Sequence, residues 1–302
     1  MNETILNFII NKLSLLFSYA YELKMPMKKA YFFYHHFILK LLLDDLYQAK
    51  SEMSEIQLNK KFFPNKIWVM WWQGLDNAPQ LVLNNIKRLY SIFGENNVIV
   101  ITQNNFEKYT KIQSFLYDKT KKGEITFALW SDIIRYNLLF NNGGLWVDST
   151  VILANNVKEY LESLKETSFV SLCNKQDDCR YISNNKWSGW FIGGSRDYKL
   201  FRFIVSFFDV YFKNHNKQID YFLVDDAVYY FYMQNKQFRR TISEQSLDWN
   251  PYLFANNYKS KDSVKLIHLF NTMRKYSIQK FSYKIKYNTS KESLFNLLNS
   301  KN

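Results

Sequence analysis

The sequence predicts an α/β fold in which a mostly parallel sheet is flanked by helices. Short apolar runs typical of buried strands recur along the chain, and stretches with helical spacing of apolar residues follow most of them. Hydrophobic residues make up 47% of the 302 positions, which is enough for a large packed core. Alternating strands and helices favour a parallel sheet covered by helices.

The expected elements follow one another without an internal repeat or a low-complexity linker. Buried strands are predicted at residues 66–72, 98–101, 145–152, 169–173, 190–192 and 266–269. Helices are predicted at residues 79–93, 125–141, 197–213 and 219–235. Gly143 and Gly144 come directly after one of these helices, where glycine commonly ends a helix.

Two parts are expected: a helical N-terminal extension, residues 1–62, and an α/β domain, residues 63–302. Apolar residues recur at helical spacing over 4–24 and 27–61. Pro64 marks the boundary, because proline disfavours the continuation of a helix. We expect the helix pair to pack on the domain, to bind a partner or to lie on a membrane surface.

The N-terminus does not resemble a targeting segment. It lacks the basic start and the small-residue cleavage site of a signal peptide. Asn7, Asn11 and Lys12 interrupt an apolar stretch that is too short to span a bilayer. Cys173 and Cys179 form neither a disulfide framework nor a C-x-x-C pair, which favours a reducing compartment. We expect a cytoplasmic protein, in peripheral contact with the inner face of the membrane if the N-terminal helices bind it.

Positive charge is concentrated toward the C-terminus. The formal net charge is +13, and residues 251–302 hold ten Lys/Arg against two Asp/Glu. Such a surface suits nucleic acid, anionic lipid headgroups or a diphosphate. The run Lys280–Tyr287 interleaves basic and apolar residues, which is equally typical of a solvated amphipathic element. No nucleic-acid-binding motif is present, so no nucleic-acid partner is expected.

Three charged residues lie close to the predicted strand at 145–152. Asp148 follows Leu145–Val147, and a carboxylate at the carboxyl end of a parallel strand is well placed for ligand or metal chemistry. Asp132 and Arg135 are three residues apart, so they share one face of the preceding helix. Such a pair is either a structural ion pair or a set of polar groups for a hydroxyl-rich ligand.

The spacing of these residues matches a longer pattern, S-D-x-x-R-x-x-x-L-x-x-x-G-G-x-x-x-D, at every fixed position from Ser131 to Asp148. This pattern resembles the signature of the capsular polysaccharide synthesis and family 32 glycosyltransferases, which carry a D-x-D sugar-binding region. The runs Lys66–Gly74 and Tyr221–Asp225 resemble the first strand and a downstream helix of that group. The resemblance covers about residues 63–270.

The resemblance implies a GT-A fold, a nucleotide-sugar donor such as a UDP-hexose, and a role for each matching residue. Asp132 and Arg135 would hold the hydroxyls of the donor sugar, and Asp148 would lie beside the ribose and the metal-bound diphosphate. Residues of the first strand would face the base. The further donor-binding residues expected are Trp68, Trp71, Gln73, Gly144, Trp146 and Thr150.

One position departs from the D-x-D pattern, because Thr150 stands where a second carboxylate is expected. The resemblance implies Mn²⁺ or Mg²⁺, and hard divalent cations prefer carboxylate and phosphate oxygens. Either Asp148 and the diphosphate hold the ion with fewer protein ligands, or another residue completes the shell. His268, on the predicted strand at 266–269, is a candidate ligand, although a histidine between apolar neighbours is more often a core residue.

The acceptor side of the site is less specific. Asp225 could orient the acceptor hydroxyl, so it joins Asp148 as a candidate catalytic residue. Trp187, Trp190 and Gly193–Gly194 could form an acceptor loop, because aromatic faces stack on sugar rings. Two basic residues, Arg274 and Lys275, could stabilise the leaving diphosphate.

The predicted function is transfer of a hexose to a glycan or lipid-linked acceptor in bacterial capsular polysaccharide or exopolysaccharide synthesis. The resemblance implies retention of anomeric configuration. The alternative is a non-catalytic protein that binds nucleotide sugar or glycan on a degenerate transferase fold, and Thr150 is its best support. A basic nucleic-acid-binding protein is a weaker alternative.

Overall fold

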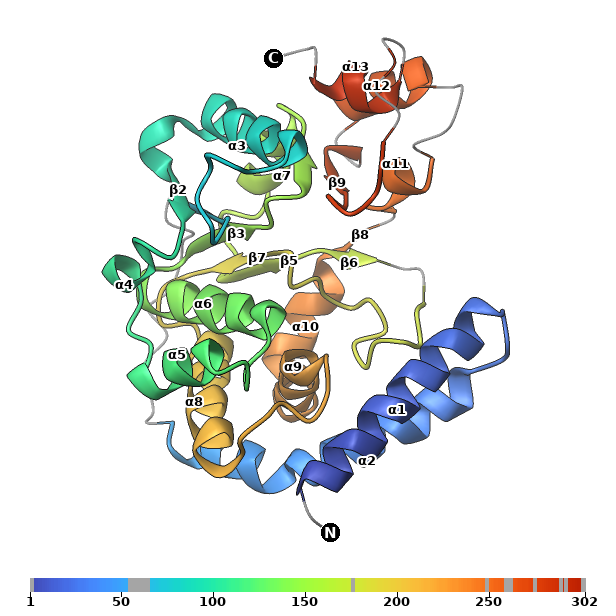
Figure 1. Ribbon diagram of the computed structural model, residues 1–302. Helices are drawn as coiled ribbons and strands as arrows, with labels where there is room; N and C mark the ends of the chain where they lie inside the picture. The colour runs from blue at the N-terminus through green and yellow to red at the C-terminus, as the bar shows by residue number, and fades with distance from the viewer. Residues whose placement is uncertain are drawn as a thin grey trace.

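A five-stranded sheet lies at the centre of the protein (Figure 1). The computed structural model describes residues 3–53, 66–174, 177–247, 250–257, 263–273, 276–287, 290 and 293–299. The strands are β1 (Ile67–Met70), β2 (Val98–Ile101), β3 (Gly144–Val147), β5 (Phe169–Ser171) and β7 (Phe191–Gly194), in the order β2-β1-β3-β7-β5. β1 runs parallel to both β2 and β3, whereas β7 runs antiparallel to β3 and β5. The predicted mostly parallel α/β sheet is confirmed.

Side chains alternate strictly between the two faces of this sheet, as the period of a strand requires. Trp68 and Trp146 join the core on one face, whereas Val69 and Val147 join the core on the other. Both faces are apolar because helices cover both of them, which explains why the predicted strands read as continuous apolar runs.

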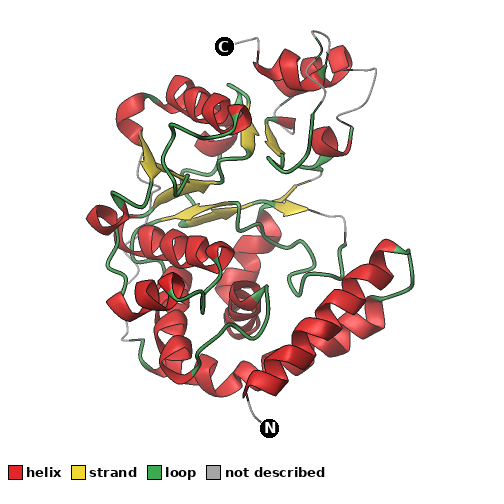
Figure 2. Ribbon diagram, in the orientation of Figure 1, coloured by secondary structure: helices red, strands yellow, loops and turns green. Residues whose placement is uncertain are grey.

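Figure 2 shows the helices on either side of the sheet. One side carries α3 (Gln80–Phe93) and the short α7 (Val157–Glu162). The other side carries α6 (Phe127–Asn142), α8 (Lys199–Asn214), α9 (Leu223–Gln234) and α10 (Lys236–Glu244). Two small helices, α4 (Phe106–Tyr109) and α5 (Ser114–Lys121), lie beside α6. The helices predicted at 79–93, 125–141, 197–213 and 219–235 are thereby confirmed, with shifted ends.

The N-terminal helices pack against the main body rather than standing apart from it. α1 (Glu3–Glu22) and α2 (Lys28–Ser51) form a hairpin, and α2 packs on α8 and α9. Tyr34 of α2 donates a 2.5 Å hydrogen bond to Asp220. α2 ends ten residues earlier than predicted. Residues 54–65, which hold the predicted boundary and Pro64, lie outside the described residues, so the division at residue 62 stays a prediction.

Within the described part of the chain, no helix combines the length and the apolar character that a membrane crossing requires.

The C-terminal part forms a third apolar cluster beside the sheet. It contains α11 (Leu253–Asn256), α12 (Ser263–Thr272) and α13 (Leu294–Asn299). A two-stranded ladder attaches it to the main body, because β9 (Ile278–Lys280) pairs antiparallel with β4 (Val151–Leu153). A second short ladder joins β6 (Cys173–Asn174) to β8 (Ser246–Leu247).

Two predicted strands are wrong in detail. The strand predicted at 145–152 is two strands, because the chain turns at residues 148–150 between β3 and β4. The strand predicted at 266–269 is part of helix α12, in which Leu266, Ile267 and Phe270 form a buried stripe. A window of four residues cannot separate a short buried strand from the buried side of a helix.

Candidate functional site

Asp148 lies at the carboxyl edge of the sheet, in the turn that joins β3 to β4. Its backbone N–H donates to the carbonyl of Trp190 (2.9 Å), and its own carbonyl accepts from the N–H of Val151 (2.9 Å). These two bonds fix the turn from both sides, so the carboxylate has a defined position just beyond the strand. Its side chain remains 25% exposed.

Gly143 and Gly144, at the junction of α6 and β3, allow the strand to follow the helix directly. Gly144 has a φ of 105°, and a Cβ atom there would lie 2.6 Å from the carbonyl oxygen of Lys66. The indole of Trp68 donates to the carbonyl of Gly143 (2.8 Å). Glycine is therefore required by the protein's own packing between β1 and β3, and not by the approach of a ligand.

Arg135 of α6 lies between Asp132 and Asp148, the two carboxylates of the sequence pattern. Its guanidinium contacts Asp132 one turn earlier on the helix, and its Nη2 lies 3.3 Å from Oδ1 of Asp148. The guanidinium lies 4.8 Å from the ring of Trp146, whose indole donates to the same Oδ1 (2.8 Å). The Arg135 side chain is only 8% exposed, so it forms the buried floor of this charged cluster.

Lys280 completes the cluster from the opposite side. Its Nζ lies 2.6 Å from Oδ2 of Asp148 and 2.8 Å from the hydroxyl of Thr150. The β4–β9 ladder places it there, because Lys280 pairs with Val151 in the register of the two strands. The sequence shows only that Lys280 belongs to a basic run. Its contact with Asp148 joins residues that are 132 positions apart in the chain.

These charges set the pKa values of the two carboxylates in different directions. Burial would raise the pKa of Asp148, but the ammonium of Lys280 and the guanidinium of Arg135 outweigh burial and hold it below its usual value. Burial raises the pKa of Asp132 to about 6, even though Arg135 lowers it, and the negative charge of Asp148 adds to the rise. Asp148 is thus ionised at neutral pH, whereas Asp132 loses its proton at about pH 6, close to neutral.

Asp225, in the first turn of α9, is the third carboxylate of the region. Its Oδ1 accepts from the indole of Trp187 (2.5 Å), and its Oδ2 accepts from the backbone N–H of Ser183 (3.3 Å). Burial raises its pKa to about 6, and the charge of Asp132 contributes to the rise. The structure therefore brings Trp187 and Asp225, both predicted for the acceptor side, into contact with each other and close enough to Asp132 for its charge to affect Asp225.

Aromatic side chains border the cluster. The ring of Trp71 packs edge-on against Tyr283 (5.5 Å between centroids), and the indole of Trp190 donates to the hydroxyl of Tyr252 (3.1 Å). Tyr221 is 59% exposed, and its pKa is raised by burial and by the charges of Asp132 and Asp148. Such rings present flat faces for a base or a sugar.

Several predicted site residues are buried or belong to neighbouring elements. Trp68, Gly144 and Trp146 are buried, with Trp68 at 0% exposure, and the donor contact expected of these three stays a prediction. Gly193–Gly194 belong to strand β7 and not to an acceptor loop, and a Cβ at Gly193 would lie 2.5 Å from the carbonyl of Gly144. Gln73 is exposed beyond the end of β1.

The C-terminal candidates also differ from expectation. His268 lies on the exposed side of α12. It is therefore neither on a strand nor in the buried core. The C-terminal cluster contributes Lys280 to Asp148. The basic residues predicted to face the diphosphate, Arg274 and Lys275, lie outside the described residues.

The arrangement around Asp148 does not fit a bound divalent cation. Both carboxylate oxygens already accept from cationic or N–H donors, and the Lys280 ammonium lies between Asp148 and Thr150, where the D-x-D pattern would hold the ion. A metal ion there would face the ammonium at close range, which is strongly unfavourable. The part of the chain that the structure describes contains no group of three or more His, Cys, Asp or Glu that could hold a metal.

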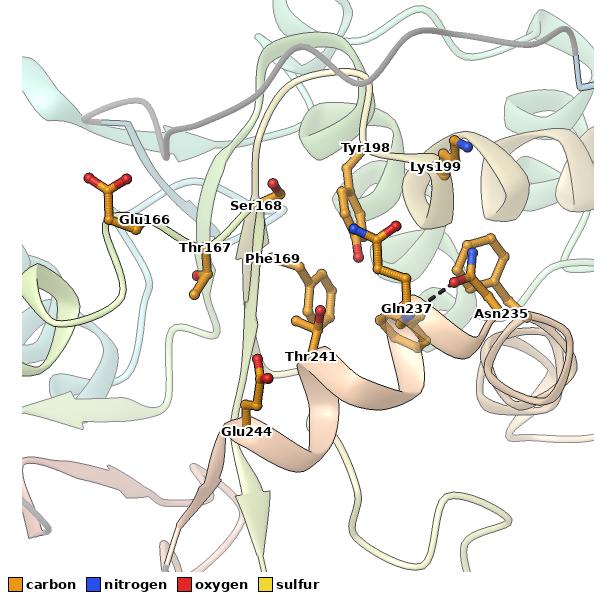
Figure 3. Close-up of a pocket in the computed structure, with 12 residues that line it drawn as sticks. Glu166, Thr167, Ser168, Phe169, Tyr198, Lys199, Asn235, Gln237, Thr241 and Glu244 are labelled. Atoms are coloured by element: carbon orange, nitrogen blue, oxygen red, sulfur yellow. Dashed lines mark hydrogen bonds between the residues drawn. The ribbon is translucent and has the colours of Figure 1, made fainter.

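A separate pocket of about 220 Å³ lies at the opposite edge of the sheet (Figure 3). Phe169, at the start of β5, lines it together with residues of α10 such as Thr241 and Glu244. Phe169 pairs with Gly194, which in turn pairs with Gly144, so the pocket lies where β3 begins and Asp148 lies where β3 ends. None of the predicted site residues lines this pocket.

Fold and site together define an α/β protein that gathers an arginine, a lysine and three carboxylates at the carboxyl edge of its sheet. A family model described as "Capsular polysaccharide synthesis protein" matches residues 9–298. The chain belongs to this capsular polysaccharide synthesis family. Searches of curated proteins and of solved structures gave no significant match. The predicted family resemblance is confirmed to this extent, and the membership indicates a role in capsule biosynthesis.

Asp225→Asn is expected to change the pH dependence of both stability and activity. A carboxyl whose pKa rises to about 6 on folding releases its proton more readily in the unfolded chain, so its share of the stability is lost as pH rises from about 4 to 6. The amide cannot titrate, and the free energy of unfolding should fall less over this range. If Asp225 has the predicted role of orienting and deprotonating an acceptor hydroxyl, the substitution should also lower kcat about 10²-fold.

Asp209→Asn is the matched control. Burial raises the pKa of Asp209, on α8, to about 6 as well. This variant should flatten the pH dependence of urea unfolding but leave the pH profile of activity unchanged. A wild-type rate and pH profile in Asp225→Asn would remove Asp225 from the chemistry.

Proposed function

We propose that this protein is a glycosyltransferase that moves a hexose from a nucleoside-diphosphate sugar, such as UDP-hexose, to a glycan or lipid-linked acceptor in capsular polysaccharide synthesis. The reaction would retain the anomeric configuration, and the fold would be of the GT-A type. The observation that carries the proposal is the bridge that Arg135 makes between Asp132 and Asp148. Capsule family membership supports the substrate class.

The bridge is suited to a donor sugar because its cation is more deeply buried than its two carboxylates. The side chain of Arg135 is 8% exposed, whereas those of Asp132 and Asp148 are 17% and 25% exposed. These carboxylates are held on a rigid support and remain partly exposed, so the remaining lone pairs of their oxygens can accept hydrogen bonds from sugar hydroxyls. Asp225, whose pKa is about 6, would be ionised at neutral pH and would accept the proton of an acceptor hydroxyl.

The direct test is a transfer and hydrolysis assay with a panel of UDP-, GDP- and dTDP-sugars. Release of nucleoside diphosphate is measured with and without a mixture of capsule-type oligosaccharide acceptors, each in the presence of EDTA or Mn²⁺. We expect turnover with one class of donor. Binding of a nucleotide sugar without any turnover would favour the alternative, a non-catalytic binding protein.

We further propose that α1 attaches the protein to an anionic membrane surface, where a lipid-linked acceptor would lie. A stripe of about 120° on this helix holds apolar side chains with more than two fifths of their surface exposed. They are Ile5, Phe8, Ile9, Leu15, Leu16 and Tyr19. The charged residue within the stripe is Lys12, and exposed lysines at 24, 28 and 29 follow the helix. Apolar residues with a basic border are typical of helices that lie in the membrane interface.

Binding to vesicles tests this surface. We expect the protein to sediment with phosphatidylcholine vesicles that contain phosphatidylglycerol, and Phe8→Ser with Leu16→Ser should weaken binding at least about tenfold. The matched control is Met233→Ser with Val264→Ser, which removes two exposed apolar side chains from other helices. If Phe8→Ser with Leu16→Ser instead dissolves a dimer that forms without lipid, the stripe binds a second copy and not a membrane.

A further inference from the structure

The ammonium group of Lys280 occupies the position between residues 148 and 150. In the D-x-D pattern two carboxylates at these positions would face a divalent cation. Here the second is Thr150, and Nζ of Lys280 lies 2.6 Å from Asp148 and 2.8 Å from Thr150. Lys280 therefore contacts Thr150, the residue that stands where the second carboxylate is expected.

We propose that Lys280 binds the diphosphate of the donor and replaces the divalent metal, so that this protein binds its nucleotide without a metal ion. The proposal rests on the proposed function, because it names a further residue of the same donor site. It assigns to a residue of β9 a role that the sequence pattern would give to a metal ion.

The backbone holds Lys280 firmly enough for this role. Its own N–H donates to the carbonyl of Pro251 (2.8 Å), and the N–H of Phe281 donates to the carbonyl of Thr150 (2.9 Å). The Lys280 side chain is only 19% exposed, and its ammonium lies 6.0 Å from the ring of Trp190. A lysine fixed in this way loses little further freedom when a phosphate arrives, unlike a lysine on a mobile surface.

The charges around Lys280 also fit one ammonium better than a divalent ion. Two carboxylates at 148 and 150 would carry two negative charges, whereas Asp148 and Thr150 carry one, and the ammonium balances it. An ammonium has three N–H donors, and Asp148 and Thr150 take two. The third is left for a phosphate oxygen, with which it forms a charge-assisted hydrogen bond.

The same hydrogen bond would assist the transfer step. The bond between the anomeric carbon and the β-phosphate oxygen breaks, and its electron pair stays on that oxygen. The acceptor oxygen forms the new bond on the same face of the anomeric carbon that the leaving oxygen vacates, which retains the configuration, and its proton passes to Asp225. Lys280 keeps its proton and donates a hydrogen bond to the diphosphate as negative charge develops there.

Calorimetric binding of UDP, GDP and dTDP in EDTA and in Mn²⁺ tests the proposal. We expect wild-type protein to bind one of them in EDTA with an affinity that Mn²⁺ changes less than about twofold. Lys280→Met should weaken this binding about tenfold or more, Lys280→Arg should retain most of it, and the corresponding nucleoside should bind all three proteins equally. Lys284→Met, which removes an exposed lysine of the same basic run, is the matched control.

The outcomes separate the two proposals. If Mn²⁺ is required for diphosphate binding, and Lys280→Met keeps that requirement at wild-type affinity, the lysine does not replace the metal although the donor site stands. If Lys280→Met weakens nucleoside and diphosphate binding alike, and Lys280→Arg does not rescue, Lys280 is only a structural residue. If no nucleoside diphosphate binds to the wild-type protein under either condition, the proposed function falls together with the role of Lys280.

Discussion

Asp148→Asn is expected to lower the rate of sugar transfer by at least about 10³-fold. Asp148 accepts from Trp146 and Arg135 through one oxygen and from Lys280 through the other. An amide offers a single oxygen, so whichever way it turns, its NH₂ group faces a cation. The asparagine side chain has the same size, but it no longer holds both Arg135 and Lys280 in position. Initial rates with the preferred nucleotide sugar measure the effect.

Asp118→Asn is the control for this substitution. Asp118 is an exposed carboxylate on α5 that pairs with Lys121, and its replacement should leave the rate at the wild-type value. Circular dichroism and thermal unfolding show whether Asp148→Asn remains folded. A folded Asp148→Asn variant that transfers sugar at the wild-type rate would mean that the site has been misplaced.

Arg135→Met is expected to destabilise the protein by about 3 kcal/mol at pH 8. The guanidinium is buried between Asp132 and Asp148, and without it two carboxylates face each other without a shared counter-charge. The pKa of Asp132 should then rise further, because the group that lowers it is gone. The destabilisation should therefore shrink toward pH 5, where Asp132 becomes protonated. Urea unfolding at several pH values measures it.

Arg240→Met provides the comparison, because Arg240 also pairs with a carboxylate but is 81% exposed on α10. Its loss should change the free energy of unfolding by less than about 0.5 kcal/mol. Adding Asp132→Asn to Arg135→Met should recover part of the stability. If Arg135→Met unfolds at the wild-type urea concentration, the bridge contributes nothing and the carboxylates are solvated independently.

The local half of the site could be predicted from the sequence. Asp132, Arg135 and Asp148 lie within one helix–turn–strand unit, and a helix followed by Gly143–Gly144 returns the chain to the strand at a known point. The helical spacing of Asp132 and Arg135, together with the family resemblance that includes Asp148, therefore predicts that they lie together. The same holds for the sheet, because its buried strands are continuous apolar runs.

The long-range half could not be predicted. Lys280 reaches Asp148 only through the β4–β9 ladder, and β9 is three residues long with one lysine among them. Trp187 and Asp225 were each recognised as candidates, but their hydrogen bond joins a loop to a helix 38 residues later. Local periodicity carries no information about such pairings, since they are set by tertiary packing.

The turn after β3 shows a second limit of sequence reasoning. Ser149 and Thr150 made residues 145–152 look like one strand, because β-branched and small polar residues fit an alternating pattern. The break depends on the hydrogen bond from Val151 to the Asp148 carbonyl and on the Trp190 carbonyl that holds Asp148. This turn is also what directs the Asp148 carboxylate to the sheet edge.

The β4–β9 ladder also determines when the charged cluster can form during translation. A ribosome synthesises Asp148 first and Lys280 132 residues later, so the growing chain contains Arg135 and its two carboxylates long before the second cation exists. Early folding of the sheet alone would yield an incompletely balanced site. Docking of β9 on β4 therefore completes the charged cluster, and a chain arrested before residue 278 would lack the second cation.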